Sequence, residues 1–146
     1  MKTIPVLLIA LITVFTLAQA GYCDDVVTTV SQFYELVEKG DLETLFSYVP
    51  MEIVKKIAET ENHEGIGGDL GIIIDVAGAV HEKLATVKFQ NFQVTVENTT
   101  KTTATARAKY DLHTMVNNQA DQGKGNDTIS LVKSGEKWLI EKIINE

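Results

Sequence analysis

The spacing of apolar residues changes once along this chain, near Leu84, and this change constrains the fold more than any other feature. Before it, apolar residues recur every three or four positions, as on one face of an amphipathic helix. After it they alternate with polar residues, as in Ala104, Ala106, Ala108 and Tyr110, which predicts half-buried strands. Helices followed by strands predict an α+β domain, with N-terminal helices packed on a strongly curved antiparallel sheet.

Local signals divide the helical half. Four helices are expected, at about residues 25–39, 42–49, 51–60 and 70–84. Gly40 is placed to end the first helix, and Pro50 stops the second. Asp41 and Asp69 are expected to cap the second and fourth helices. The Gly-rich segment before Asp69 is expected to be a flexible loop.

The strand half divides in the same way. Four strands are expected, at about residues 86–97, 102–116, 127–133 and 137–143. The apolar phase of the first strand shifts by one position at Asn91, which predicts a β-bulge. The polar, Gly-containing stretch NNQADQGKGN (residues 117–126) is expected to be a loop.

The first 20 residues have the pattern of a secretory signal peptide. Lys2 is their only charge, an apolar run follows, and Ala18-Gln19-Ala20 is a small-x-small cleavage site. We therefore expect a signal peptide at residues 1–20 and a single mature domain at 21–146. The mature domain is expected to be periplasmic or secreted.

Cys23, the only cysteine, leaves three alternatives open. It is a free thiol, half of an intermolecular disulfide, or a lipid-anchored cysteine at a bacterial membrane. Lipidation of Cys23 would require a small preceding residue, whereas Tyr22 precedes it. A membrane is expected as a partner only if Cys23 is lipidated.

The net charge of −7 argues against several partners and cofactors. The acidic chain has no basic cluster, so nucleic acid is not an expected partner. The three histidines, His63, His81 and His113, have no ligand-like spacing, so no metal site is expected, and no cofactor motif is present.

Two segments resemble nuclear transport factor 2-like domains, also called cystatin-like cones. VVTTVSQFYELVEKGDLETLFSYVP (residues 26–50) is similar to their opening, a helix ending in an aromatic pair and a short Gly-Asp segment. TISLVKSGEKWLIEKI (residues 128–143) is similar to their last two strands. Small exported bacterial lipoprotein-type domains of unknown function look closest. The resemblance spans roughly residues 25–144 and implies a sheet curled around the first helix, with a cavity between them.

Four residues are candidates to line that cavity. Tyr34 follows Phe33 in the aromatic pair, and its hydroxyl needs a partner if it is buried. Tyr110 shares the face of the alanine row, and Trp138 opens the last strand. His81 lies on the apolar stripe of the fourth helix, where a shielded imidazole is a candidate acid–base group. For each of the four, the alternative to a role in ligand binding or catalysis is a structural role, as a packed residue in the core or at its boundary.

Two functional hypotheses follow. The first is a non-catalytic exported domain that binds a small apolar ligand or a protein partner, with Tyr34, His81, Tyr110 and Trp138 as candidate contacts. The second is a cavity enzyme of the isomerase or polyketide-cyclase type, with His81 as the acid–base residue. The fold implied by the resemblance does not choose between them, and a homodimer remains open.

Overall fold

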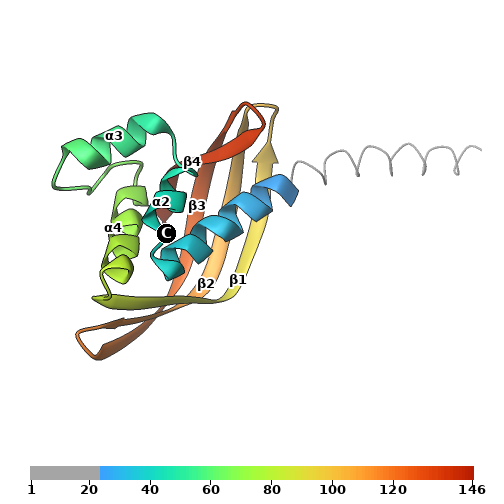
Figure 1. Ribbon diagram of the computed structural model, residues 1–146. Helices are drawn as coiled ribbons and strands as arrows, with labels where there is room; N and C mark the ends of the chain where they lie inside the picture. Colours follow the sequence, from blue (N-terminus) through green and yellow to red (C-terminus); the bar gives the residue numbers. More distant parts are fainter. Residues whose placement is uncertain (1–23) are drawn as a thin grey trace, which may run out of the picture.

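The computed structural model describes residues 24–146, and the expected signal peptide and Cys23 lie outside the described residues. The first helix covers residues 24–39. It is followed by α2 (Leu42–Phe46), α3 (Met51–Glu59), α4 (Leu70–His81), β1 (Ala85–Thr99), β2 (Thr103–Val116), β3 (Gln119–Ser134) and β4 (Lys137–Asn145). The strands form one antiparallel sheet in the order β1-β2-β3-β4. The predicted α+β class is therefore confirmed, and the sheet curves around the first helix (Figure 1).

The core lies between the first helix and the inner face of the sheet. Val26, Val30, Phe33 and Val37 form a fully buried stripe on the helix, as their spacing predicts. The alanines of β2 lie on the inner face of the sheet, where they are buried. Their small side chains let the helix lie close to the sheet. Burying each larger apolar side chain contributes about 1.5–3 kcal/mol.

The β-bulge predicted at Asn91 is confirmed. The register between β1 and β2 shifts between Gln90 and Gln93, and Asn91 has a φ of 52°. The extra residue allows Phe89 and Phe92, three positions apart, both to pack against the core. The bulge thus concentrates aromatic side chains at one place inside the sheet.

The loop predicted at residues 117–126 is wrong for most of its length. Asn117 and Asn118 form a two-residue turn with φ values of 52° and 63°, and β3 begins directly after it. Residues Gln119 to Asn126 then pair one by one with the end of β2. The polar, Gly-containing composition suggested a loop, but a long neighbouring strand supplies a backbone partner for every residue.

The Gly-rich segment before α4 is also more ordered than expected, because it covers the edge of β4. The amide of Asp69 donates to the carbonyl of Ile143 over 2.7 Å, and the amide of Ile143 donates to the carbonyl of Gly67 over 3.1 Å. Gly68 has a φ of +66°, and a Cβ there would lie 2.4 Å from the Ile143 oxygen. A side chain is therefore excluded where this segment protects the sheet edge.

The two predicted aspartate caps differ in outcome. The side chain of Asp41 accepts a hydrogen bond from the amide of Thr44 and caps α2 as expected. Asp69 makes no capping bond to α4, and its carboxylate instead accepts from the backbone amide of Asn145 over 2.8 Å. Within residues 24–146, no helix is both long and apolar enough to cross a membrane.

Candidate functional site

Two of the predicted site residues meet at a buried carboxylate. Tyr34, on the first helix, donates its hydroxyl to Asp127 Oδ2 over 2.5 Å. Tyr110, on β2, donates to the same oxygen over 2.7 Å. The side-chain amide of Asn145 (Nδ2), at the end of β4, donates to Asp127 Oδ1 over 2.6 Å. These four residues are called the inner network below.

Asp127 is the residue that the sequence reasoning missed. Its exposed fraction is 0%, and it is the buried charged residue of the described core. Its spacing in the sequence indicates burial, because alternate residues of a strand face the same side and Asp127 therefore lies on the inward side of β3 with Ile129 and Leu131. A buried charge must be paired or hydrogen-bonded. The predicted need of the Tyr34 hydroxyl for a partner is confirmed, and Asp127 is that partner.

Aromatic rings surround the inner network on the helix side and on the β1 side. The ring of Tyr34 has its centroid 5.0 Å from that of Phe89, 4.9 Å from that of Phe92 and 5.6 Å from that of Tyr110. Phe33 lies edge-on to Tyr34 at 5.7 Å. Such separations are those of rings in direct contact. The rings therefore occupy the space beside the hydroxyls, where an interior ligand would have to lie.

Gly125 makes the position of Tyr110 attainable. It pairs directly with Tyr110 across β2 and β3. A Cβ on Gly125 would lie 2.1 Å from Tyr110 Cζ and 2.5 Å from its hydroxyl oxygen. The tyrosine ring thus lies over a strand glycine, which lets its hydroxyl reach Asp127 two residues further along β3.

The buried environment fixes the protonation of both tyrosines. Burial, followed by the nearby charge of Asp127, raises the pKa of Tyr34 well above its ordinary value of 10.0. Burial and the hydrogen bond to Asp127 likewise raise the pKa of Tyr110. Both hydroxyls therefore stay protonated at neutral pH and act as donors. They are arranged to hold a carboxylate of the same chain.

The expected burial of His81 is wrong. His81 is the last residue of α4 and is exposed, and Leu84 beyond it is 60% exposed. Its Nδ1 lies 3.1 Å from the carbonyl oxygen of Gly40. The apolar stripe predicted burial only if the helix continued, but α4 ends here against the turn at Gly40. Within residues 24–146, His81 makes no hydrogen bond to Tyr34 or Tyr110.

Trp138 is buried as its inward phase predicts, with 2% of its surface exposed. The Nζ of Lys133 lies 5.3 Å from the centre of the Trp138 ring. The indole Nε1 has no hydrogen-bond partner within the described residues. Ligand contact by Trp138, Tyr34, Tyr110 or His81 stays a prediction.

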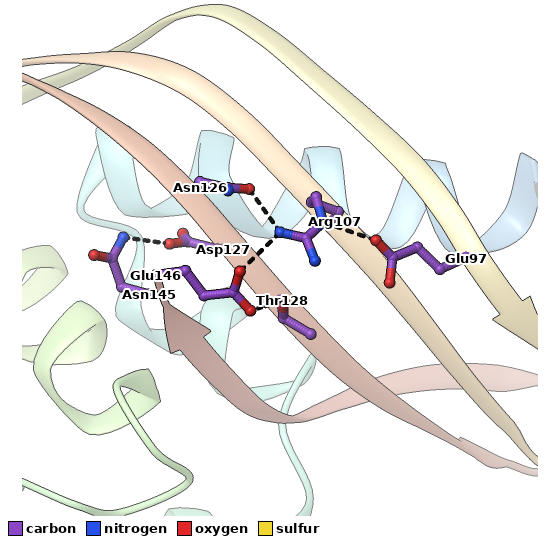
Figure 2. Close-up of polar contacts among 7 residues, drawn as sticks. All are labelled: Glu97, Arg107, Asn126, Asp127, Thr128, Asn145 and Glu146. Atoms are coloured by element: carbon purple, nitrogen blue, oxygen red, sulfur yellow. Dashed lines mark hydrogen bonds and ion pairs between the residues drawn. The ribbon is translucent and has the colours of Figure 1, made fainter.

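A second polar cluster lies on the outer face of the sheet, and Figure 2 shows it beside the Asp127–Asn145 contact. Arg107 donates to Glu97 over 2.7 Å, to Glu146 over 3.0 Å and to Asn126 over 3.1 Å. Thr128 also donates to Glu146. Asn145 therefore bonds to Asp127 on the inner face of the sheet, while the adjacent Glu146 bonds to Arg107 and Thr128 on the outer face. The C-terminal end of β4 is thus held by contacts on both faces.

A groove lies between α3 and the outer side of β3 and β4. Its volume is about 590 Å³, and it is lined by Pro50, Met51, Glu52, Ile53, Lys56, Ile66, Gly67, Val132, Ser134, Leu139 and Glu141. Met51 is 67% exposed. Val132 and Leu139 pair across β3 and β4, on the face opposite the core. The groove therefore presents apolar side chains, of which Ile53 and Ile66 also pack against the core.

Within residues 24–146, no group of three or more histidine, cysteine, aspartate or glutamate side chains is placed to hold a metal ion. For the whole chain, the absence of a metal site stays a prediction, because this finding covers the described residues alone.

Comparison with solved structures decides the fold. A protein from Catenulispora acidiphila superposes with a TM-score of 0.59 at 13% identity, covering 88% of this chain and 93% of that one. A proposed dehydratase of the nuclear transport factor 2-like family from Streptomyces avermitilis gives 0.58 at 16% identity, with coverage of 84% and 93%. A nuclear transport factor 2-like protein with a cystatin-like fold from Novosphingobium aromaticivorans gives 0.55 at 17% identity, covering 92% and 86%.

This chain has the nuclear transport factor 2-like fold. The resemblance inferred from its two end segments is confirmed at the level of fold. No protein-family model matches the chain, and no curated protein matches it. Because the structural relatives are below 20% identity, the nuclear transport factor 2-like fold is what they establish, and activity has to be argued from the site.

Proposed function

We propose that this chain is an exported, non-catalytic domain that binds a small apolar ligand in the groove between α3 and β3–β4. The observation that carries the proposal is the inner network. Both tyrosine hydroxyls that could face an interior substrate donate to Asp127 instead, and aromatic rings fill the space beside them. The groove is a concave, partly apolar surface that is open to a ligand.

The size and lining of the groove support a small molecule. Its volume of about 590 Å³ falls in the range of about 300–1,000 Å³ that is usual for small-molecule sites. Met51, Ile53 and Leu139 supply apolar contacts, while Lys56 and Glu141 supply polar groups at the same groove. Glu52 and Ser134 add further polar groups, so the groove combines an apolar wall with polar side chains that could orient a ligand.

A neutral apolar fluorophore, N-phenyl-1-naphthylamine, tests the groove in solution. Met51→Glu should weaken its binding by about ten- to a hundredfold, because burying a methionine side chain contributes about 1.5–3 kcal/mol. Leu84→Glu is the matched control, since Leu84 is exposed to a similar extent and does not line the groove. Equal binding by the two variants, or no binding by the unaltered protein, would refute the proposal.

The cavity-enzyme hypothesis has one point in its favour, the structural neighbour described as a proposed dehydratase. The position of His81 does not support it, because this ring is exposed at the end of α4 and contacts Gly40. Isolation of a substrate that the protein converts, with loss of conversion in His81→Gln, would favour the enzyme over the binding domain.

Export is supported by the pattern of residues 1–20. The intact mass of the protein recovered outside the cytoplasm is expected to correspond to a chain beginning at Gly21. A mass with a diacylglyceryl group on Cys23 would instead identify a lipid anchor, and retention of residues 1–20 would contradict cleavage.

A further inference from the structure

His63 lies in the segment between α3 and α4, and both of its ring nitrogens face oxygen atoms. Nδ1 is 2.6 Å from Asp75 Oδ1 on α4. Nε2 is 2.9 Å from the carbonyl oxygen of Ile57 and 2.9 Å from that of Thr60, at the end of α3. The ring therefore joins the end of one helix to the side of the next.

This geometry is satisfied by only one protonation state. A neutral imidazole has one N–H and one lone pair, so either tautomer would direct a lone pair at an oxygen. With Nδ1 bare, the lone pair would face the carboxylate of Asp75. With Nε2 bare, it would face two carbonyl oxygens. The imidazolium donates from both nitrogens and satisfies all the contacts.

We propose that His63 is a proton-dependent clasp, which fastens α3 to α4 as the imidazolium and releases α3 when the proton is lost. Since α3 forms one wall of the groove, the clasp also controls the width of that groove. This last consequence rests on the proposed function, whereas the clasp itself does not.

The helix α3 has little buried surface of its own to hold it in place. Of its residues only Ile57 is buried, and its N-terminal residue, Met51, is largely exposed. The last carbonyl groups of a helix lack partners within the helix and favour a cation nearby. His63 supplies that cation at Ile57 and Thr60, so the contact both ends α3 and holds it in place.

The position of His63 is fixed by close packing against α4. A Cβ on Gly71 would lie 2.2 Å from the His63 carbonyl oxygen and 3.1 Å from its Cβ, so the segment lies directly against a glycine of α4. Gly71 precedes Asp75 by one helical turn, which places the glycine and the carboxylate on the same side of α4. The His63 side chain is only 16% exposed. This glycine supplies the close approach that the ring needs to reach Asp75.

Asp75 is the charged side chain that contacts the His63 ring. Asp75 faces it from α4, and α3 presents neutral carbonyl groups. The flanking Glu61 and Glu64 make no hydrogen bond or ion pair with the ring, and within residues 24–146 no lysine or arginine does so. The hydrogen bond to Asp75 is the largest cause that raises the pKa of His63 above 6.5.

The sign of the effect follows from the raised pKa. The bound proton stabilises the closed arrangement fully below pH 6.5, the value for a released ring. That stabilisation is lost as the pH rises through the folded pKa. Between low and high pH, the equilibrium constant for opening α3 should increase about tenfold for each pH unit by which the folded pKa of His63 exceeds 6.5.

Hydrogen exchange of the purified protein between about pH 5.5 and 8.5 tests the clasp without any ligand. After correction for intrinsic exchange rates, protection of residues 51–59 should be constant at low pH and fall through the folded pKa. Protection of β2 should not change over this range. His63→Gln should abolish the pH-dependent step in α3, and His81→Gln, the matched control, should keep it.

Asp75→Asn provides a second, milder test, because Asp75 is about half exposed on its helix. This variant should keep the fold and move the step to lower pH. An NMR titration that gives His63 a pKa at or below 6.5 would overturn the proposal, as would an unchanged step in His63→Gln or Asp75→Asn. If the step occurs but N-phenyl-1-naphthylamine binds at no pH, the clasp stands and the proposed function fails.

Discussion

Tyr34→Phe is the sharpest test of the inner network, because it removes one hydroxyl and keeps the ring. The ring contacts with Phe89, Phe92 and Tyr110, at centroid distances of 4.9–5.6 Å, remain available. Asp127 loses one of its three side-chain hydrogen bonds. Because a hydrogen bond to a charged group contributes about 1.5–3 kcal/mol, the free energy of unfolding should fall by about that amount.

The double variant separates a network from independent contacts. Tyr34→Phe or Tyr110→Phe alone leaves one donor on Asp127 Oδ2, whereas the two together leave that buried oxygen with none. The loss in the double variant should therefore exceed the sum of the single losses by about 1 kcal/mol.

Urea denaturation at pH 7, followed by the fluorescence of Trp138, the only tryptophan, measures these losses. Tyr48→Phe is the matched control, because its hydroxyl donates to Gln32 at an exposed position. Its loss should stay within about 0.5 kcal/mol. If Tyr34→Phe costs no more than this control, Asp127 does not depend on the hydroxyl and the reasoning is wrong.

Three further predictions concern the same interior. Gly125→Ala should cost about 2–4 kcal/mol in urea denaturation, because its Cβ would collide with the Tyr110 ring, whereas Gly123→Ala, with open space around it, should be nearly neutral. Trp138→Ala should cost about 3–5 kcal/mol, and a loss under about 1 kcal/mol would mean that Trp138 is not buried. In an alkaline titration followed by tyrosinate absorbance, Tyr34 and Tyr110 should ionise only on unfolding. Their raised pKa values stabilise the fold fully below about pH 10, and that stabilisation is lost at higher pH. The chain also contains Tyr22 and Tyr48, so the Tyr34→Phe and Tyr110→Phe variants assign the signals. A titration near pH 10 in the folded protein that disappears in either variant would contradict this.

The order and type of the main elements could be predicted from the sequence, because both periodicities are local. The stripe Val26, Val30, Phe33 and Val37 must face one way on a helix, and the alternation of β2 must face one way on a sheet. The bulge at Asn91 was also visible as a change of phase. The extension of β3 back to Gln119 was not, because a polar strand end depends on its pairing with β2.

The sequence indicated only some of the residues of the candidate site. Tyr34 needed a partner by its own chemistry, but Asp127 lies 93 positions away, and only the packing of the first helix against β3 brings them together. His81 illustrates the reverse error, since its stripe suggested burial, while the end of α4 left the ring at the surface. His63, which had no distinctive spacing, became notable only when the chain placed acceptors at both of its nitrogens.

The sequence by itself thus determined the type and order of the helices and strands, and the apolar face of most of them, because these depend on residues within a few positions of one another. Only the tertiary structure decided which polar side chains meet. The contacts of Asp127 with Tyr34 and Asn145, and of His63 with Asp75, depend on how whole elements are placed. Burial makes the contacts of Asp127 consequential, since a polar group removed from water must find its partner within the protein.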